Sequence, residues 1–179
     1  SELNFEFFSS GLLYRVIALH MEKTNSLNLN EFEIISNDPV VCKVNGNVYK
    51  EENLYTPEIN TKSSEIAQLS EVRIIVSNVL QFMFKNSNIG LVVEGRDMGS
   101  VVFKNADLKI YLDASEAVRS ERRIAQSDNK ESVEDLRARD SRDINRKISP
   151  LVIADDAIVI DNENKSIDEV IKIIKENLK

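Results

Sequence analysis

The chain has 179 residues, of which 42% are hydrophobic and 30% charged, and its net charge is −7. This length and composition predict one folded domain with room for a small insertion. The acidic balance disfavours broad nucleic-acid binding, which needs a wide basic surface. One cysteine and one histidine, Cys42 and His20, make a Cys/His zinc site untenable and suit a reducing cytoplasm. No apolar run approaches the ~20 residues that span a bilayer, so no membrane partner is expected.

The first third of the chain predicts a helix followed by a hairpin. Residues 3–8 are a short apolar stretch to which no element is assigned. Apolar residues at helical spacing predict a helix over residues 12–21. Two β-like runs follow, at residues 40–44 and 47–50. Between them Asn45-Gly46 is a strong hairpin signal, so residues 33–55 are expected to form a small antiparallel insertion.

The rest of the chain predicts alternating helices and strands. A long amphipathic helix is expected first, at residues 63–86. The expected strands are residues 89–94, 108–112 and 157–160, and further helices are expected at residues 115–126 and 132–146, joined by a polar link at 127–131. Ser166 and Glu169 form a capping-box pattern at the start of the last helix. Strands alternating with helices indicate an α/β fold with a parallel sheet.

Seven of the ten arginines lie between Arg119 and Arg146, although the chain as a whole is acidic. Residues three and four apart share a helix face, and two such faces are expected here: Arg119, Arg122 and Arg123 on one helix, and Arg139, Arg142 and Arg146 on the next, with Asp143 among them. Guanidinium groups match phosphate oxygens in a bidentate way, so a small, highly charged ligand is indicated. The alternative is a pair of solvated helices carrying Arg–Glu pairs.

A second charged group follows the expected strand 89–94. In open α/β sheets, ligands bind beyond the carboxyl ends of the strands, where Glu94, Arg96 and Asp97 stand around Gly95. A carboxylate there can hold a hydrated Mg²⁺, and an arginine can clamp a phosphate. The alternative is an ordinary surface turn. Together with the arginine-rich helices, this set favours phosphoryl transfer, which depends on positioning and electrostatic stabilisation and needs no nucleophilic side chain.

Several separated motifs resemble bacterial cytidylate kinases, in order and over essentially the whole chain. They are residues 10–15 (SGLLYR), 92–103 (VVEGRDMGSVVF), 108–114 and 139–146 (RDSRDINR). The resemblance implies an α/β fold with a P-loop-kinase-like parallel sheet flanked by helices. It also implies a core of residues 1–24 and 87–179 with a mobile helical lid at about 115–137, and a small α+β NMP-binding insertion at residues 25–86.

The resemblance further implies a cytoplasmic monomer that transfers the ATP γ-phosphoryl group to CMP or dCMP with Mg²⁺. Carried over by position, the residues implied at the acceptor nucleotide are Ser10, Tyr14, Arg15, Ser64, Arg73, Asp97, Arg139 and Asp143. The catalytic arginines implied are Arg96, Arg142 and Arg146, the lid arginines over ATP are Arg119, Arg122 and Arg123, and Glu94 is implied in Mg²⁺ binding through water.

Cytosine recognition follows from hydrogen-bond polarity. The Asp97 carboxylate can accept from the N4 amino group, while Arg73 and Ser64 can donate to the ring. Uracil would turn an acceptor toward the carboxylate, and that mismatch discriminates strongly. Structural alternatives stay open: Tyr14 packing at a helix start, Arg15 and Arg73 as solvated helix arginines, Ser64 as an N-cap, and Asp143 as an i,i+4 partner of Arg139.

Two departures from the family pattern qualify the resemblance. Kinases of this type carry a G-x-x-x-x-G-K-[ST] loop that cradles donor phosphates, and none of the five glycines precedes a Lys-Ser/Thr pair. We therefore expect the first βα unit to be absent from this chain, and the chain alone to be inactive without that loop. Ser9 stands where the family usually has Asp. The alternative functions are a P-loop-less CMP-binding or regulatory homologue without turnover and, disfavoured by the acidity, a nucleic-acid-associated protein.

Overall fold

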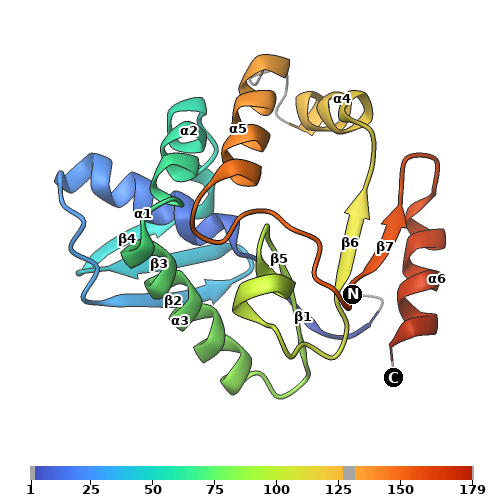
Figure 1. Cartoon of the computed structure of the whole chain (residues 1–179). Coiled ribbons are helices and arrows are strands. Elements are labelled where there is room, and N and C mark those ends of the chain that lie inside the picture. Colours follow the sequence, from blue (N-terminus) through green and yellow to red (C-terminus); the bar gives the residue numbers. More distant parts are fainter. Residues whose placement is uncertain (1–2, 127–131, 179) are drawn as a thin grey trace. The chain divides into compact units, whose positions relative to one another are not determined.

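The computed structural model describes residues 3–126 and 132–178, so the expected link at 127–131 and part of the expected lid at 115–137 lie outside the described residues. Its internal contacts divide the chain into two compact units (Figure 1). The first unit comprises Leu3–Gly95 and Arg146–Ile148, and the second comprises Arg96–Asn145 and Ser149–Lys179. The division into core, insertion and lid expected from the sequence stays a prediction.

The first unit contains a parallel strand pair that leads directly into a helix. Strand β1 (Glu6–Ser9) pairs with β5 (Leu91–Glu94), and Ser9 lies opposite Glu94. Strand β1 has no counterpart among the sequence-based predictions, because four residues are too few to show alternation. Phe8 is buried on one side of this pair, whereas Phe7 is 59% exposed on the other. The expected strand at 89–94 is confirmed as a parallel strand, but Val92 is 41% exposed, so it is not covered on both faces.

Helix α1 (Gly11–Thr24) is the centre of the first unit's core. It is buried on almost every side over its first ten residues, which explains why its hydrophobic pattern is nearly continuous. The helix ends at Asn25, whose left-handed backbone (φ 51°) lets its N–H reach the Met21 carbonyl, a common way to end a helix. The helix predicted at residues 12–21 is therefore confirmed and is longer at both ends.

An antiparallel sheet packs against this helix. Its order is β2 (Phe32–Asn37), β3 (Val40–Val44) and β4 (Asn47–Lys50), followed by a 3₁₀ turn (Glu51–Asn53). The hairpin at Asn45-Gly46 is confirmed, and both residues have positive φ angles, 46° and 83°, as this tight turn requires. Cys42 and Tyr49 face each other across the sheet and are buried, so Cys42 is a core residue.

The prediction of one long helix at residues 63–86 is wrong in one respect, because the segment forms two helices. Helix α2 (Pro57–Ile66) begins six residues earlier than expected, with the Thr56 side chain accepting a hydrogen bond from the Ile59 N–H, a favourable N-cap. Leu69 is extended (φ −83°, ψ 124°), and α3 (Ser70–Asn86) starts after it. The Arg73 Nη1 donates to the Ala67 carbonyl at 2.8 Å, so an arginine of α3 caps the end of α2 and stabilises the break.

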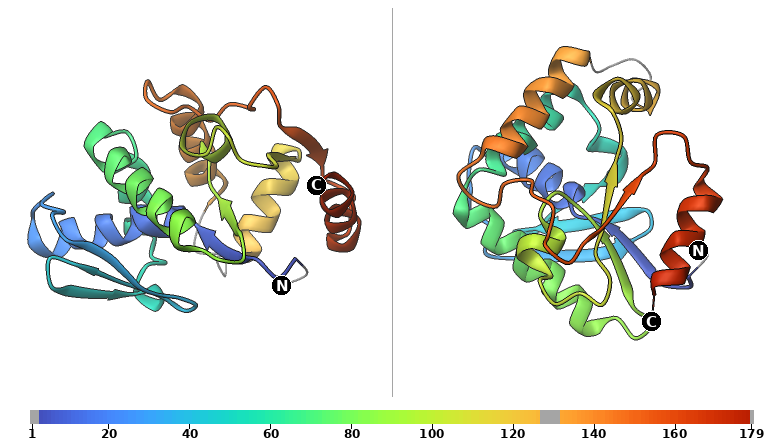
Figure 2. Two further views of the ribbon diagram at one scale, coloured as in Figure 1. Left: turned by 90° about the horizontal axis from the view of Figure 1, so that it is seen from below. Right: turned by 45° about the vertical axis from the view of Figure 1, so that its right-hand side comes forward.

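The second unit is built on another parallel pair, β6 (Ile110–Asp113) with β7 (Ile158–Asp161). A single π-helical turn (Met98–Val102) precedes β6, and helices α4 (Glu116–Gln126) and α5 (Val133–Asn145) follow it. Helix α6 (Ile167–Asn177) runs beside β7 (Figure 2). The expected strands and helices of this half are confirmed to within a few residues, and the Ser166–Glu169 capping box forms in full.

The expected mixed α/β architecture with parallel pairing is confirmed. The described parallel strands form two pairs, β1–β5 and β6–β7. Within the described ranges, no helix is long and apolar enough to cross a membrane.

Candidate active site

A buried arginine in the first unit connects three helices. Arg73 of α3 is 5% exposed, and besides capping α2 it places its guanidinium carbon 5.7 Å from the centre of the Tyr14 ring on α1. This separation lies within cation–π range. Ser64 of α2 is also buried, and it lies three residues before the carbonyl that Arg73 caps. The structure thus brings Ser64, Arg73 and Tyr14 to one region where α1, α2 and α3 meet.

These positions exclude two of the structural alternatives. Ser64 lies well inside α2, whose N-cap is Thr56, so it is not an N-cap. Arg15 and Arg73 are each only 5% exposed, so neither is a solvated helix arginine. Burying a guanidinium costs free energy unless hydrogen bonds and charges compensate for lost water, so both side chains need specific partners.

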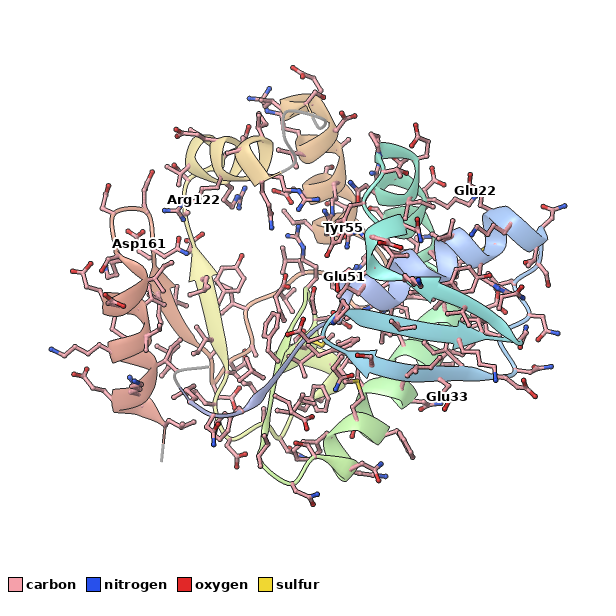
Figure 3. The ribbon with its side chains drawn as sticks, turned by 180° about the vertical axis from the view of Figure 1, so that it is seen from behind. Glu22, Glu33, Glu51, Tyr55, Arg122 and Asp161 are labelled. Carbon is pink, nitrogen blue, oxygen red and sulfur yellow. The ribbon has the colours of Figure 1, made fainter. Side chains whose placement is uncertain are left out.

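Arg15 has such partners within the first unit. Its Nε donates to the Asn60 Oδ1 of α2 at 3.0 Å, and its guanidinium carbon lies 5.2 Å from the centre of the Tyr55 ring. The Tyr55 hydroxyl in turn donates to the Glu51 Oε1 at 3.3 Å (Figure 3). The other Glu51 carboxylate oxygen accepts from the Val40 N–H at 2.9 Å. Arg15 is therefore connected to the antiparallel sheet as well as to α2.

Ser10 and Glu94 meet at the ends of β1 and β5. The Ser10 N–H donates to the Glu94 carbonyl at 2.9 Å, and Ser10 is buried. The Glu94 side chain is exposed. Among the described residues, no group of three His, Cys, Asp or Glu side chains could hold a metal ion, so Glu94 stands as a single carboxylate at a strand end. Arg146, which also belongs to the first unit, is buried.

The second unit contains an arginine–carboxylate network. The Arg96 Nε contacts the Asp143 Oδ2 at 3.3 Å, and its Nη2 contacts the Asp140 Oδ1 at 3.3 Å. The second oxygen of Asp140 contacts the Arg119 Nη2 at 3.2 Å. The Asp140 carboxylate of α5 thus contacts both Arg96, in the segment after β5, and Arg119 of α4. Asp143 is buried, and its pairing with Arg96 shows that it does more than accompany Arg139 along the helix.

Asp97 is buried beside Arg96 in the chain, and its carbonyl accepts the Val101 and Val102 N–H groups at 2.9 and 3.2 Å. These bonds start the π-helical turn, an uncommon local structure that is frequent at functional sites. The turn fixes the backbone of Asp97 directly after Arg96.

The three arginines of α4, which were expected to share one helix face, have different partners. Arg119 belongs to the Asp140 network, whereas Arg122 binds the turn after β7: it donates to the Asn162 side-chain and main-chain oxygens at 3.0 Å and to the Glu163 carbonyl at 3.1 Å (Figure 3). Arg123 contacts Gln126 on its own helix at 3.0 Å. Arg137 pairs with Glu116, so part of the expected pattern of solvated helices with ion pairs is also present.

A family model described as Cytidylate kinase matches residues 1–179. The chain belongs to the cytidylate kinase family. Cytidylate kinase 1 of Haemophilus influenzae is 35% identical over 188 residues, covering 95% of this chain and 80% of the relative. The cytidylate kinase of Thermotoga maritima is 34% identical over 196 residues, covering 99% and 88%, and that of Mycoplasmopsis synoviae is 34% identical over 188 residues, covering 97% and 86%.

Three side chains of the candidate site were missed from sequence. Asn60 and Tyr55 lie in polar and loop segments where such residues are ordinary, and only the fold shows that they hold Arg15. Asp140 stands inside the motif at residues 139–146. Its position inside an arginine-rich helix, between Arg139 and Arg142, was a usable signal, since one carboxylate can serve two guanidinium groups.

Proposed function

We propose that this protein is a nucleoside monophosphate kinase that transfers the γ-phosphoryl group of ATP to CMP or dCMP, giving CDP or dCDP. Its membership of the cytidylate kinase family, matched over residues 1–179, is the observation that carries the proposal. The relatives named cytidylate kinase agree with it, and this chain covers 80% or more of each relative described above.

For the acceptor nucleotide, we assign the base to Ser64, Arg73 and Asp97. The hydroxyl and guanidinium can donate to the cytosine ring, and the carboxylate can accept from its amino group. All three side chains are buried, which supports a role in selectivity because a mismatched hydrogen bond is costly away from water. Uracil would leave such groups mismatched.

The remaining acceptor residues are assigned by their positions in the motifs that resemble the family. Arg15 would bind the CMP phosphate, since a buried guanidinium forms strong charge-assisted bonds with phosphate. Ser10 and Tyr14 would line the same site from the start of α1. Arg139 and Asp143 of α5 would bind the sugar.

Three arginines are proposed to stabilise the transferring phosphoryl group: Arg96, Arg142 and Arg146. In phosphoryl transfer, charge spreads over the transferred oxygens, and fixed positive groups lower the barrier. Arg96 already meets two carboxylates, Asp140 and Asp143, so an incoming phosphate would exchange with them. Residues from about 115 to 137 would serve as the lid over ATP, with Arg119, Arg122 and Arg123 on α4, and residues 25–86 as the NMP-binding insertion.

Mg²⁺ is the cofactor implied for ATP. Magnesium keeps several waters and is usually bound through one or two carboxylates plus substrate phosphates. A single exposed carboxylate at a strand end, Glu94, fits that mode and does not fit an all-protein cage. We assign Glu94 to the hydrated ion, which would neutralise phosphate charge when bound.

An assay of ADP formation from ATP with CMP, dCMP, UMP and AMP as acceptors tests the proposal. We expect CMP and dCMP to be converted far faster than UMP and AMP, and equal rates for all four would contradict the base assignment. The sequence contains no G-x-x-x-x-G-K-[ST] motif, and we propose that turnover depends on a loop of that kind being supplied. The alternative function is CMP binding without turnover. Calorimetric CMP binding, with no ADP formed even when such a loop is supplied, would favour it.

A further inference from the structure

The guanidinium of Arg15 occupies a position that other residues of the first unit define. An arginine side chain has many rotamers, and holding it in one of them costs conformational entropy. Here the Asn60 side-chain oxygen accepts a hydrogen bond from Nε at 3.0 Å, and the guanidinium carbon lies 5.2 Å from the centre of the Tyr55 ring. A guanidinium is a planar fork, so these two contacts restrict the direction in which its outer nitrogens point.

Gly11 provides the space for this orientation. It lies one helical turn before Arg15 on α1, and a Cβ added at Gly11 would approach the Arg15 Nη1 to 3.1 Å. That separation is tighter than ordinary van der Waals contact, so a larger residue would push the outer nitrogen by a few tenths of an ångström. The backbone at Gly11 is helical, so conformational freedom does not explain a glycine there. Room for the guanidinium does.

The chemistry of these neighbours suits an arginine that serves a ligand. Asn60 and Tyr55 are neutral, so their contacts orient the guanidinium without cancelling its charge. Arg96 differs, because the two carboxylates of Asp140 and Asp143 contact it. An amide oxygen that fixes Nε leaves the geometry of the fork intact for bidentate contact with phosphate.

We infer that Asn60 and Gly11 are positioning residues for Arg15: the Asn60 side chain holds the guanidinium and Gly11 leaves it room, so that it receives the phosphate of a nucleoside monophosphate. The inference deepens the proposed function and rests on it. Neither residue needs to touch the nucleotide. Their effect should therefore appear in recognition of the phosphate and not in recognition of the base or sugar.

Calorimetric titration of the protein with CMP and with cytidine, which lacks the phosphate, separates these contributions. Asn60→Leu keeps the size of the side chain and removes the acceptor. We expect it to weaken CMP binding about 10-fold or more, since hydrogen bonds to charged groups are among the stronger ones, and to change cytidine binding less than about twofold. Ser63→Ala is the matched control, because Ser63 Oγ donates to the main-chain oxygen of Asn60. It should leave the ratio of CMP to cytidine affinity unchanged.

Gly11→Ala is an independent variant, and it still tests the inference if Asn60→Leu folds poorly. Alanine favours a helix over glycine, so the melting temperature should hold or rise while CMP binding weakens about threefold or more, as small misplacements of a binding group are costly. Equal weakening for CMP and cytidine, or no change in either variant, would overturn the positioning role. If the wild-type protein binds CMP no better than cytidine, the assignment of Arg15 to phosphate in the proposed function fails instead.

Discussion

Replacing Arg73 by alanine should destabilise the protein even when no nucleotide is present. The guanidinium caps the end of α2 at the Ala67 carbonyl and lies over the Tyr14 ring of α1. The substitution removes both contacts at once from a site that is 5% exposed. Water cannot readily replace a donor there, so the carbonyl would lose a partner that it has in the wild type.

The size of the effect follows from the two contacts. A hydrogen bond from a charged donor contributes about 1.5–3 kcal/mol, and a partly desolvated cation–π contact about 1–2 kcal/mol. One effect opposes this loss of stability. The alanine variant buries no charge on folding, so it avoids the cost of removing a guanidinium from water. We therefore expect the free energy of unfolding to fall by about 2 kcal/mol. The two contacts share one side chain, so the effects of Arg73→Ala and Tyr14→Leu should not add.

Urea unfolding followed by circular dichroism measures this loss directly. Lys62→Ala is the control on α2, because Lys62 is half exposed and its 3.9 Å ion pair with Glu65 is a surface one. It should change stability by less than about 0.5 kcal/mol. An Arg73→Ala protein as stable as the wild type, yet unable to bind CMP, would show that Arg73 serves only the ligand. Its contacts with Ala67 and Tyr14 would then not stabilise the packing of α1, α2 and α3.

Four further predictions concern other parts of the chain. Arg146→Ala should lower the proposed phosphoryl transfer about 10³-fold, by analogy with other arginines at transferring phosphates; an unchanged rate would remove Arg146 from the mechanism. Arg122→Ala should speed hydrogen exchange in the turn after β7, where three hydrogen bonds to Asn162 and Glu163 disappear, with no such effect of Arg123→Ala. Ser166→Ala should cost about 1 kcal/mol through loss of the N-cap, as measured by urea unfolding. Burial raises the pKa of Cys42 from 9.0 to about 12, so the unfolded state loses its proton first. The Cys42 contribution to stability should fall as pH rises from 9 toward 12, by at most about 1.4 kcal/mol per pH unit. Cys42→Ala should reduce the slope, and Tyr49, whose pKa burial also raises, should contribute to what remains.

Short local signals were sufficient for much of the fold. The Asn45-Gly46 turn and the Ser166 capping box depend on backbone angles and on side chains within four residues, so sequence determines them directly. The break between α2 and α3 is different. It contains neither glycine nor proline, and it is stabilised by the side chain of Arg73, which sequence periodicity cannot place. Strand β1 likewise exists through its pairing with β5, eighty-five residues away in register (Glu6 with Leu91).

The candidate site shows the same distinction. The residue type at a strand end pointed to Arg96, since a guanidinium there suggests phosphate, and the resemblance to the family pointed to Arg15 and Arg73. The residues that hold these arginines were not predicted. Asn60 acts through a contact 45 positions from Arg15 along the chain, and Asp140 through one 44 positions from Arg96. Contacts at that separation depend on how helices pack, and no local pattern encodes them.

Arg15 and Arg73 are held by different chemistry from Arg96 and Arg119, and the difference has a consequence for ligand binding. The contacts of Arg15 and Arg73 include an amide oxygen, a carbonyl and aromatic rings, which are neutral groups. A phosphate or a base can add to such an arrangement without displacing these contacts, which lowers the reorganisation that binding requires. Arg96 and Arg119 share the carboxylate of Asp140, so an anion that binds them must exchange with a charge already present. Arginines held by carboxylates are suited to a step in which α4 and α5 change partners, whereas arginines held by neutral groups are suited to a preformed site. The acceptor residues on α1, α2 and α3 therefore fit a preformed site, whereas the carboxylate contacts of Arg119 fit the proposed lid.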